Sequence, residues 1–61
     1  MKVKFTLNNY MLGAKVKSTP TDKIISQERI DKTHTEIVYE ITDRDKQFCE
    51  KVLAKKGEVM E

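Results

Sequence analysis

The sequence predicts a small α+β domain in which two consecutive β-hairpins form a four-stranded antiparallel sheet and one C-terminal helix packs on it. Three patterns predict this fold. Apolar and polar residues alternate over residues 1–17, β-branched and aromatic residues concentrate over residues 33–42, and apolar residues recur with helical spacing over residues 43–56. The chain of 61 residues has the length of a single domain, 1–61.

The first hairpin is predicted from a switch in the apolar alternation. Apolar residues occupy odd positions up to Leu7 and even positions from Tyr10, and Asn8-Asn9 lies between the two series. A two-residue loop produces such a switch, because alternate side chains share one face of a hairpin. Asn also tolerates the positive φ that these loops need. The pairs expected on the buried face are Leu7 with Tyr10, Phe5 with Leu12, Val3 with Ala14, and Met1 with Val16.

The middle of the chain is less distinct. The stretch STPTD at residues 18–22 is a break, in which Pro20 can begin either a helical turn or a β-turn. As a strand, residues 24–30 place Ile24 and Ile30 on one face, and as a helix they place Ile24 beside Ile25. We expect a strand that follows one helical turn. The alternative, a helix over residues 20–30, gives a ββαβα order.

Residues 33–42 are a stronger strand and complete the second hairpin. Ile37, Tyr39 and Ile41 alternate with Glu36, Val38 and Glu40, so one face is apolar. A loop at residues 31–34 places three pairs of residues opposite each other: Ile30 with Thr35, Arg29 with Glu36, and Ile24 with Ile41.

The C-terminal helix is predicted from its caps and its apolar stripe. Thr42 is a suitable N-cap, and Asp43 and Asp45 in the first turn favour the positive end of the helix dipole. Gly57 is expected to end the helix, and residues 58–61 to fray. The stripe expected to face the sheet consists of Phe48, Cys49, Val52 and Leu53.

The residue inventory argues against an enzyme. Cys49 and His34 are the only cysteine and histidine, so an internal disulfide or a zinc site of Cys and His ligands cannot form. With two glycines the chain has no Gly-rich phosphate loop. We therefore expect no catalytic residue, cofactor or metal, and we interpret Cys49 as a small buried apolar residue.

The candidate binding surface is the outer face of the first hairpin, where lysines gather and Lys2 is expected opposite Lys15, although like charges on paired strands repel. The sequence predicts a non-enzymatic interaction module that binds a protein partner of unknown identity and can also form a homodimer, as small phage or mobile-element accessory and inhibitor proteins do. A sequence-neutral nucleic-acid binder is the alternative, although the net charge is only +2. The candidate partner-binding residues are Lys2, Lys4, Lys15, Lys17 and Met11.

The expected location is cytoplasmic. Lysines interrupt the apolar residues at the start of the chain, which is untypical of a secretory signal or a membrane span.

Overall fold

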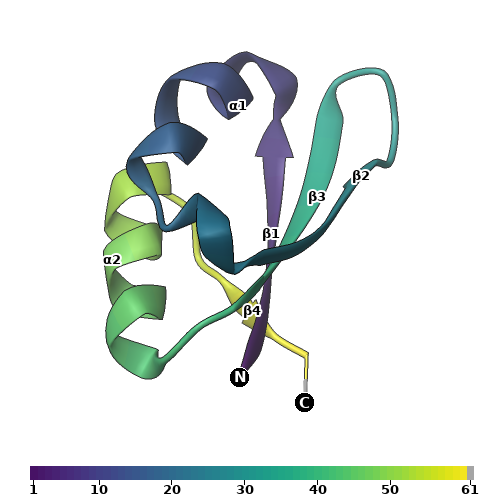
Figure 1. The fold of residues 1–61 in the computed structure, drawn as a ribbon. Coiled ribbons are helices and arrows are strands. Elements are labelled where there is room, and N and C mark those ends of the chain that lie inside the picture. Colours follow the sequence, from purple (N-terminus) through teal and green to yellow (C-terminus); the bar gives the residue numbers. More distant parts are fainter. Residues whose placement is uncertain (61) are drawn as a thin grey trace.

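The order of helices and strands is β-α-β-β-α-β (Figure 1). The computed structural model describes residues 1–60, apart from the side chains of Met11 and Leu12. The four strands form one sheet in the order β2-β3-β1-β4, and each strand is antiparallel to its neighbours. The elements are β1 (Lys2–Asn8), α1 (Asn9–Lys15), β2 (Ile24–Arg29), β3 (His34–Glu40), α2 (Asp43–Leu53) and β4 (Glu58–Val59), with the 3₁₀ turns η1 (Val16–Ser18) and η2 (Thr21–Lys23) between α1 and β2.

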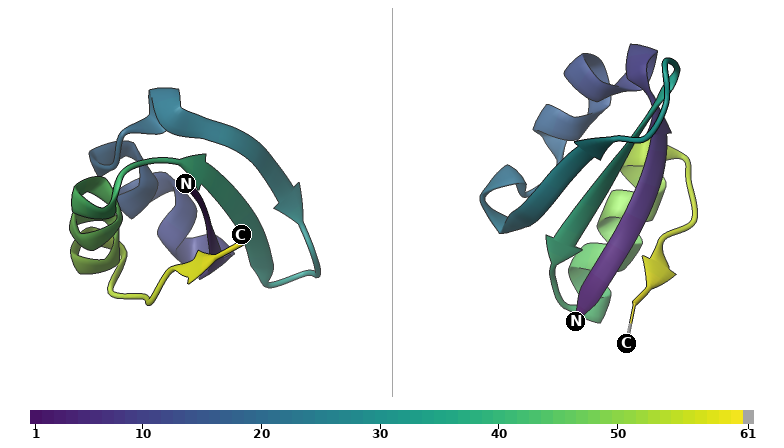
Figure 2. Two further views of the ribbon diagram at one scale, coloured as in Figure 1. Left: turned by 90° about the horizontal axis from the view of Figure 1, so that it is seen from below. Right: turned by 90° about the vertical axis from the view of Figure 1, so that its right-hand side faces the viewer.

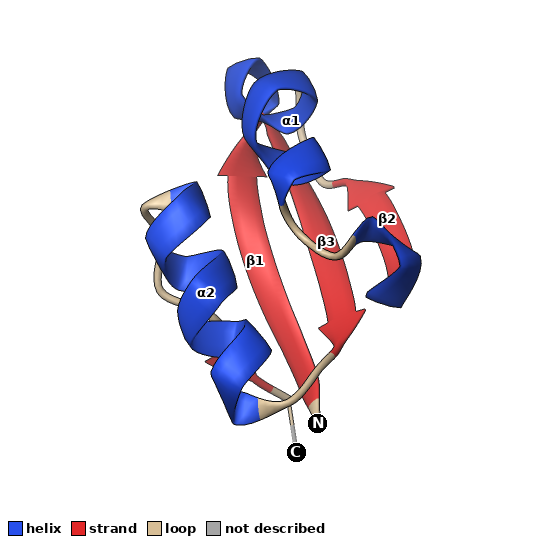
Figure 3. Cartoon of the chain, turned by 60° about the vertical axis from the view of Figure 1, so that its left-hand side comes forward, coloured by secondary structure: helices blue, strands red, loops and turns tan. Residues whose placement is uncertain are grey.

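The molecule has two layers, because α1 and α2 both lie on the same face of the sheet (Figures 2 and 3). Each helix joins two parallel strands that flank a third: α1 joins β1 to β2 around β3, and α2 joins β3 to β4 around β1. This is the split β-α-β arrangement of ferredoxin-like domains. The predicted class is confirmed, since the chain is a small α+β domain with four antiparallel strands and a C-terminal helix.

The first predicted hairpin is wrong, because the residues after Asn8 form the helix α1 and not a returning strand. A two-residue hairpin loop needs positive φ, and Ala54 is the one described non-glycine residue with a positive φ. Asn8 is extended and acts as the N-cap of α1, where its Oδ1 accepts a hydrogen bond from the Tyr10 N–H at 3.0 Å. The same asparagine that suggested a turn therefore starts a helix.

The partner of β1 is β3. The two strands pair over seven positions, from Lys2 opposite Glu40 to Asn8 opposite His34. Phe5 thereby lies opposite Ile37, and its ring meets the Tyr39 ring edge to face at a centroid distance of 5.7 Å. The core consists of Val3, Phe5, Leu7, Val16, Ile37, Tyr39, Ile41, Cys49 and Leu53, with Met1 and Ile24 packed at its margin.

The second hairpin is confirmed, but its register differs from the prediction by one residue. Arg29 lies opposite Thr35, and Glu28, not Arg29, lies opposite Glu36. A bulge between Ile24 and Ser26 shifts the register further, so that Ile24 lies opposite Tyr39. The expected helical turn followed by a strand is also confirmed, because η2 leads directly into β2, and the alternative helix over residues 20–30 is wrong.

The segment between α1 and β2 is fixed to the sheet by a buried chain of hydrogen bonds. The Thr19 hydroxyl donates its single proton to the Val16 carbonyl, and the Tyr39 hydroxyl lies 2.6 Å from the same Thr19 oxygen. Tyr39 must therefore be the donor in that second bond. Both partners are buried, so the bond satisfies the one polar group of an otherwise apolar ring.

The N-terminus of α2 is confirmed, because the Thr42 side chain accepts a hydrogen bond from the Asp45 N–H. The predicted C-terminus is wrong. The helix ends at Leu53, and Ala54 takes the left-handed conformation with φ 53°. Cys49 and Leu53 are buried as expected, whereas Phe48 is 50% exposed and does not cover the sheet.

Residues 58–59 do not fray, because they pair with β1 as the short strand β4. Gly57 allows the chain to return to the sheet at this point. A Cβ at Gly57 would lie 2.6 Å from Val3 Cγ1 and 2.8 Å from Phe5 Cζ. The Gly57 N–H also donates to the Glu50 carboxylate at 2.8 Å, which ties the segment after the helix back to α2.

We expect the two glycines to respond in opposite directions to replacement by alanine. Gly57→Ala should lower the free energy of unfolding by about 1–3 kcal/mol, because the new methyl group collides with buried side chains. Gly13→Ala should raise it by about 0.5–1 kcal/mol, because a Cβ on Gly13 meets no atom within 4 Å and alanine favours the helix. Urea unfolding of both variants measures this, and equal effects would contradict the path of residues 54–58.

Ala54→Gly should stabilise the protein. Left-handed backbone is unfavourable for alanine and not for glycine, and the gain is partly offset by the greater entropy of glycine in the unfolded chain. The expected net gain is about 0.5–1 kcal/mol, which corresponds to a rise in Tm of roughly 2–8 °C for a domain of this size. Differential scanning calorimetry measures it, and Lys55→Gly, one residue later, is the control that should not stabilise.

Candidate interaction surface

The structure separates the lysines that the sequence placed on one face. Lys2 and Lys4 lie on β1, on the face of the sheet opposite the helices, because Val3, Phe5 and Leu7 point into the core. Lys15 ends α1 and Lys17 lies in η1, and both belong to the helical layer. The predicted pairing of Lys2 with Lys15 is therefore wrong, and Lys2 lies opposite Glu40. The side chain of Met11 lies outside the described part of the structure.

The open face of the sheet, meaning the face opposite the helices, carries mixed charge. Lys4 forms an ion pair with Glu58 at 3.6 Å, and the N-terminal amine lies 3.7 Å from Glu40. Its four glutamates outnumber its two lysines, and Glu28 lies opposite Glu36, so this face does not present a positive field to an anion. Its described residues are Lys2, Lys4, Thr6, Ser26, Glu28, Glu36, Val38, Glu40 and Glu58.

The strand β2 is an edge of the sheet, with β3 on one side only. The Ile30 N–H donates to the His34 carbonyl at 3.1 Å, which fixes the phase of the ladder between the strands. Because hydrogen-bonded pairs alternate in an antiparallel ladder, Ser26 and Glu28 bond to β3, and the backbone N–H and C=O groups of Gln27 and Arg29 point away from the sheet. We call this row of outward groups on residues 24–29 the β2 edge.

The side chains along the β2 edge are also exposed. Every residue from Ile25 to Arg29 is exposed, and only Ile24 packs partly against the core. Ile25 is 52% exposed, and Ile30, just beyond the strand, is 48% exposed. Both views in Figure 2 show β2, drawn in teal, at the margin of the sheet. The strand therefore combines unpaired backbone groups with accessible apolar side chains.

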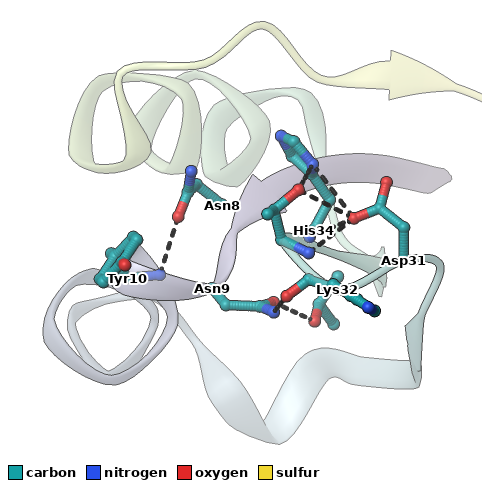
Figure 4. A network of polar contacts seen from close by, with 8 residues as sticks. Asn8, Asn9, Tyr10, Asp31, Lys32 and His34 are labelled. Atoms are coloured by element: carbon teal, nitrogen blue, oxygen red, sulfur yellow. Dashed lines mark hydrogen bonds and ion pairs between the residues drawn. The ribbon is translucent and has the colours of Figure 1, made fainter.

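The hairpin loop next to the β2 edge is held in one shape by a polar network (Figure 4). One oxygen of Asp31 accepts the N–H groups of Thr33 and His34 and the Thr33 hydroxyl, at 2.7–2.9 Å. Asn9, at the start of α1, donates from its side chain to the Lys32 carbonyl at 3.0 Å and from its backbone to the Thr33 carbonyl at 2.8 Å. The loop is thereby fastened to the junction between β1 and α1.

The pKa values of Asp31 and Cys49 are shifted from their ordinary values by their surroundings in the fold. The hydrogen bonds from the Thr33 N–H and hydroxyl, followed by that from the His34 N–H, lower the pKa of Asp31 to about 2. Burial raises the pKa of the Cys49 thiol, and the carboxylates of Asp45 and Glu50 raise it further. Cys49 is fully buried, which confirms its interpretation as a core residue. A buried thiol with a raised pKa is a poor nucleophile.

Sequence reasoning did not single out the β2 edge. The strand itself was predicted, but the candidate surface was assigned to the first hairpin, and the position of β2 at the margin depends on β1 pairing with β3. The composition of the strand was an available signal. Ser26, Gln27 and Glu28 are consecutive polar residues, which is typical of a strand that has neither face buried.

Comparison of the chain with protein-family models, with curated proteins and with solved structures found no match. None of the described helices has the length and apolar composition needed to cross a membrane. The described residues contain no pocket and no group of three or more His, Cys, Asp or Glu side chains that could hold a metal ion.

The low pKa of Asp31 predicts a pH-dependent contribution to stability. A carboxyl whose pKa falls from 3.8 in the unfolded chain to about 2 in the folded protein stabilises the fold above pH 3.8, and this stabilisation is lost as the pH falls towards 2. The difference in Tm between the wild type and Asp31→Ala should therefore be largest near neutral pH and shrink between pH 3.8 and 2. Asp22→Ala is the matched control, because Asp22 is also an exposed aspartate, and the side-chain interaction it makes among the described residues is an ion pair with Lys23 at 4.0 Å. If the difference in Tm between the wild type and Asp31→Ala did not change with pH, the hydrogen bonds to the Asp31 carboxylate would be contradicted.

Proposed function

We propose that this protein is a non-enzymatic interaction module that binds a protein partner by β-strand addition at the β2 edge. The observation that carries the proposal is the unpaired row of backbone groups at Gln27 and Arg29 on an exposed strand. Strand addition uses such a row for affinity and the neighbouring side chains for selectivity. Ile25 and Ile30 supply the accessible apolar contacts at the two ends of the row.

Two features support the β2 edge over the other edge of the sheet. The strand β2 has six residues, whereas β4 has two. The loop that follows β2 is held by Asp31 and Asn9, so the strand is presented by a rigid hairpin and loses little conformational freedom on binding.

The structure gives less support to the open face or the lysines as the binding site than to the β2 edge. Lys4 already has a carboxylate partner, and Lys2 is opposite Glu40 and not another lysine. Lys15 and Lys17 lie in the other layer. A nucleic acid binds through several cations on one continuous surface, and this arrangement does not supply one on the open face. We therefore propose a protein partner.

Site-specific photocrosslinking in the native cell tests the proposal. A photoreactive amino acid in place of Gln27 or Arg29 is exposed on the strand that forms the β2 edge, and mass spectrometry identifies the chain to which it couples. We expect discrete crosslinked protein products at both positions. The matched control carries the same amino acid at Glu36, which lies on the open face one strand inward. Crosslinks at position 36 and none at positions 27 and 29 would place the site on the open face and overturn the proposal.

A further inference from the structure

We infer that one partner of the β2 edge is a second copy of this chain, which pairs antiparallel with the first about a two-fold axis at Gln27. This inference rests on the proposed function and names its partner. The two sheets would then join into one eight-stranded antiparallel sheet, with the helices of both copies on the same face. The argument comes from the order of side chains along the strand.

The phase of the ladder limits which residues can meet across a two-fold axis. Only outward-pointing backbone groups can bond to a second copy, and these belong to Gln27 and Arg29 in the regular part of the strand. With Gln27 opposite the same residue of the second copy, the two outward rows match. The two Gln27 residues form a hydrogen-bonded pair that exchanges both of its backbone bonds.

In this register the facing side chains are compatible. Ser26 lies opposite Glu28 of the second copy, and Ile25 lies opposite Arg29 of the second copy, whose stem is apolar. By symmetry each contact occurs twice. The Glu28 carboxylates of the two copies lie on opposite sides of the axis, and the two Arg29 guanidinium groups lie at opposite ends of the paired segment.

The neighbouring registers place like charges together. Moving the axis to Glu28 sets that carboxylate opposite itself, and moving it to Arg29 sets two guanidinium groups face to face. Moving the axis to Ser26 brings Arg29 opposite Lys23 of the second copy. The register centred on Gln27 therefore uses the full length from residue 25 to residue 29 and contains no like-charged pair.

The bulge sets the extent of the pairing. It interrupts the regular ladder between Ile24 and Ser26, so the paired segment ends at Ile25 on one side and at Arg29 on the other. A segment this short is typical of a reversible dimer whose edge can also be released to another strand.

A charge-exchange series on the full chain tests the register. Ser26 is exposed on the open face, so Ser26→Glu should leave the fold intact. In the dimer, the new carboxylate of each copy would then lie opposite Glu28 of the other copy, which gives two like-charged pairs. We expect the dimer dissociation constant, measured by sedimentation velocity, to rise roughly tenfold. Adding Glu28→Lys to the same chain converts both like-charged pairs into opposite-charged pairs and should restore the wild-type value. Failure of this rescue would overturn the register.

A backbone variant tests the edge itself. The Gln27 N–H points away from β3, so Gln27→Pro removes a donor from the β2 edge without removing a bond from the ladder to β3. The expected result is loss of the dimer, with a sedimenting mass of 7.1 kDa and an unchanged circular dichroism spectrum, whereas the control Gln27→Ala dimerises. If proline disturbs the fold, a synthetic chain N-methylated at Gln27 makes the same test.

The outcomes separate this inference from the proposed function. A wild-type chain that sediments at 7.1 kDa at every concentration, while position 27 crosslinks to a different protein, overturns the second copy and supports the β2 edge as a binding site. A monomer without crosslinks at positions 27 and 29 overturns both. A dimer that survives Gln27→Pro with its fold intact places the self-association elsewhere and overturns the inference.

Discussion

The pairing of β1 with β3 is the constraint on which the rest of the structure depends. It joins residues that are 26 to 38 positions apart, from Asn8 with His34 to Lys2 with Glu40, and it places β1 in the interior of the sheet, with β4 on its other side. Phe5 thereby gains Ile37 and Tyr39 as neighbours. In a local hairpin it would have faced Leu12. The burial of these large apolar side chains offsets the entropy lost in closing the long loop.

Once β1 lies between β3 and β4, the positions of the other segments follow. The residues after Asn8 cannot form a neighbouring strand, so they cross over the sheet as α1, and Val16 covers the core from η1. The hydroxyls of Thr19 and Tyr39 then fix the end of this crossover. At the other end of the chain, Gly57 lets β4 approach Val3 and Phe5 closely enough to pair. β2 is left as an edge that the described helices do not cover.

The sequence predicted those elements whose signals are local. Thr42 and the acidic residues of the first turn are sufficient to begin α2, and the alternation around Ile37 and Tyr39 is sufficient to define β3 and its buried face. The first hairpin failed because Asn8 is equally suited to a turn and to an N-cap, and the choice depends on β3. The predicted grouping of the lysines on one face was wrong for the same reason, because only that hairpin placed Lys15 and Lys17 beside Lys2 and Lys4. The C-terminus of α2 failed because Ala54 takes a conformation that sequence assigns to glycine.

The β2 edge shows how one strand can be both protected and usable. Proteins limit unwanted strand pairing with bulges and with charged residues on edge strands, and β2 has both, in its bulge near Ile25 and in Glu28 and Arg29. These devices do not block pairing in every register. The bulge shortens the segment, and the charges oppose all but a few alignments, so a partner must match a particular sequence of side chains. The features that protect the edge against indiscriminate association therefore also determine which partner strand it can accept.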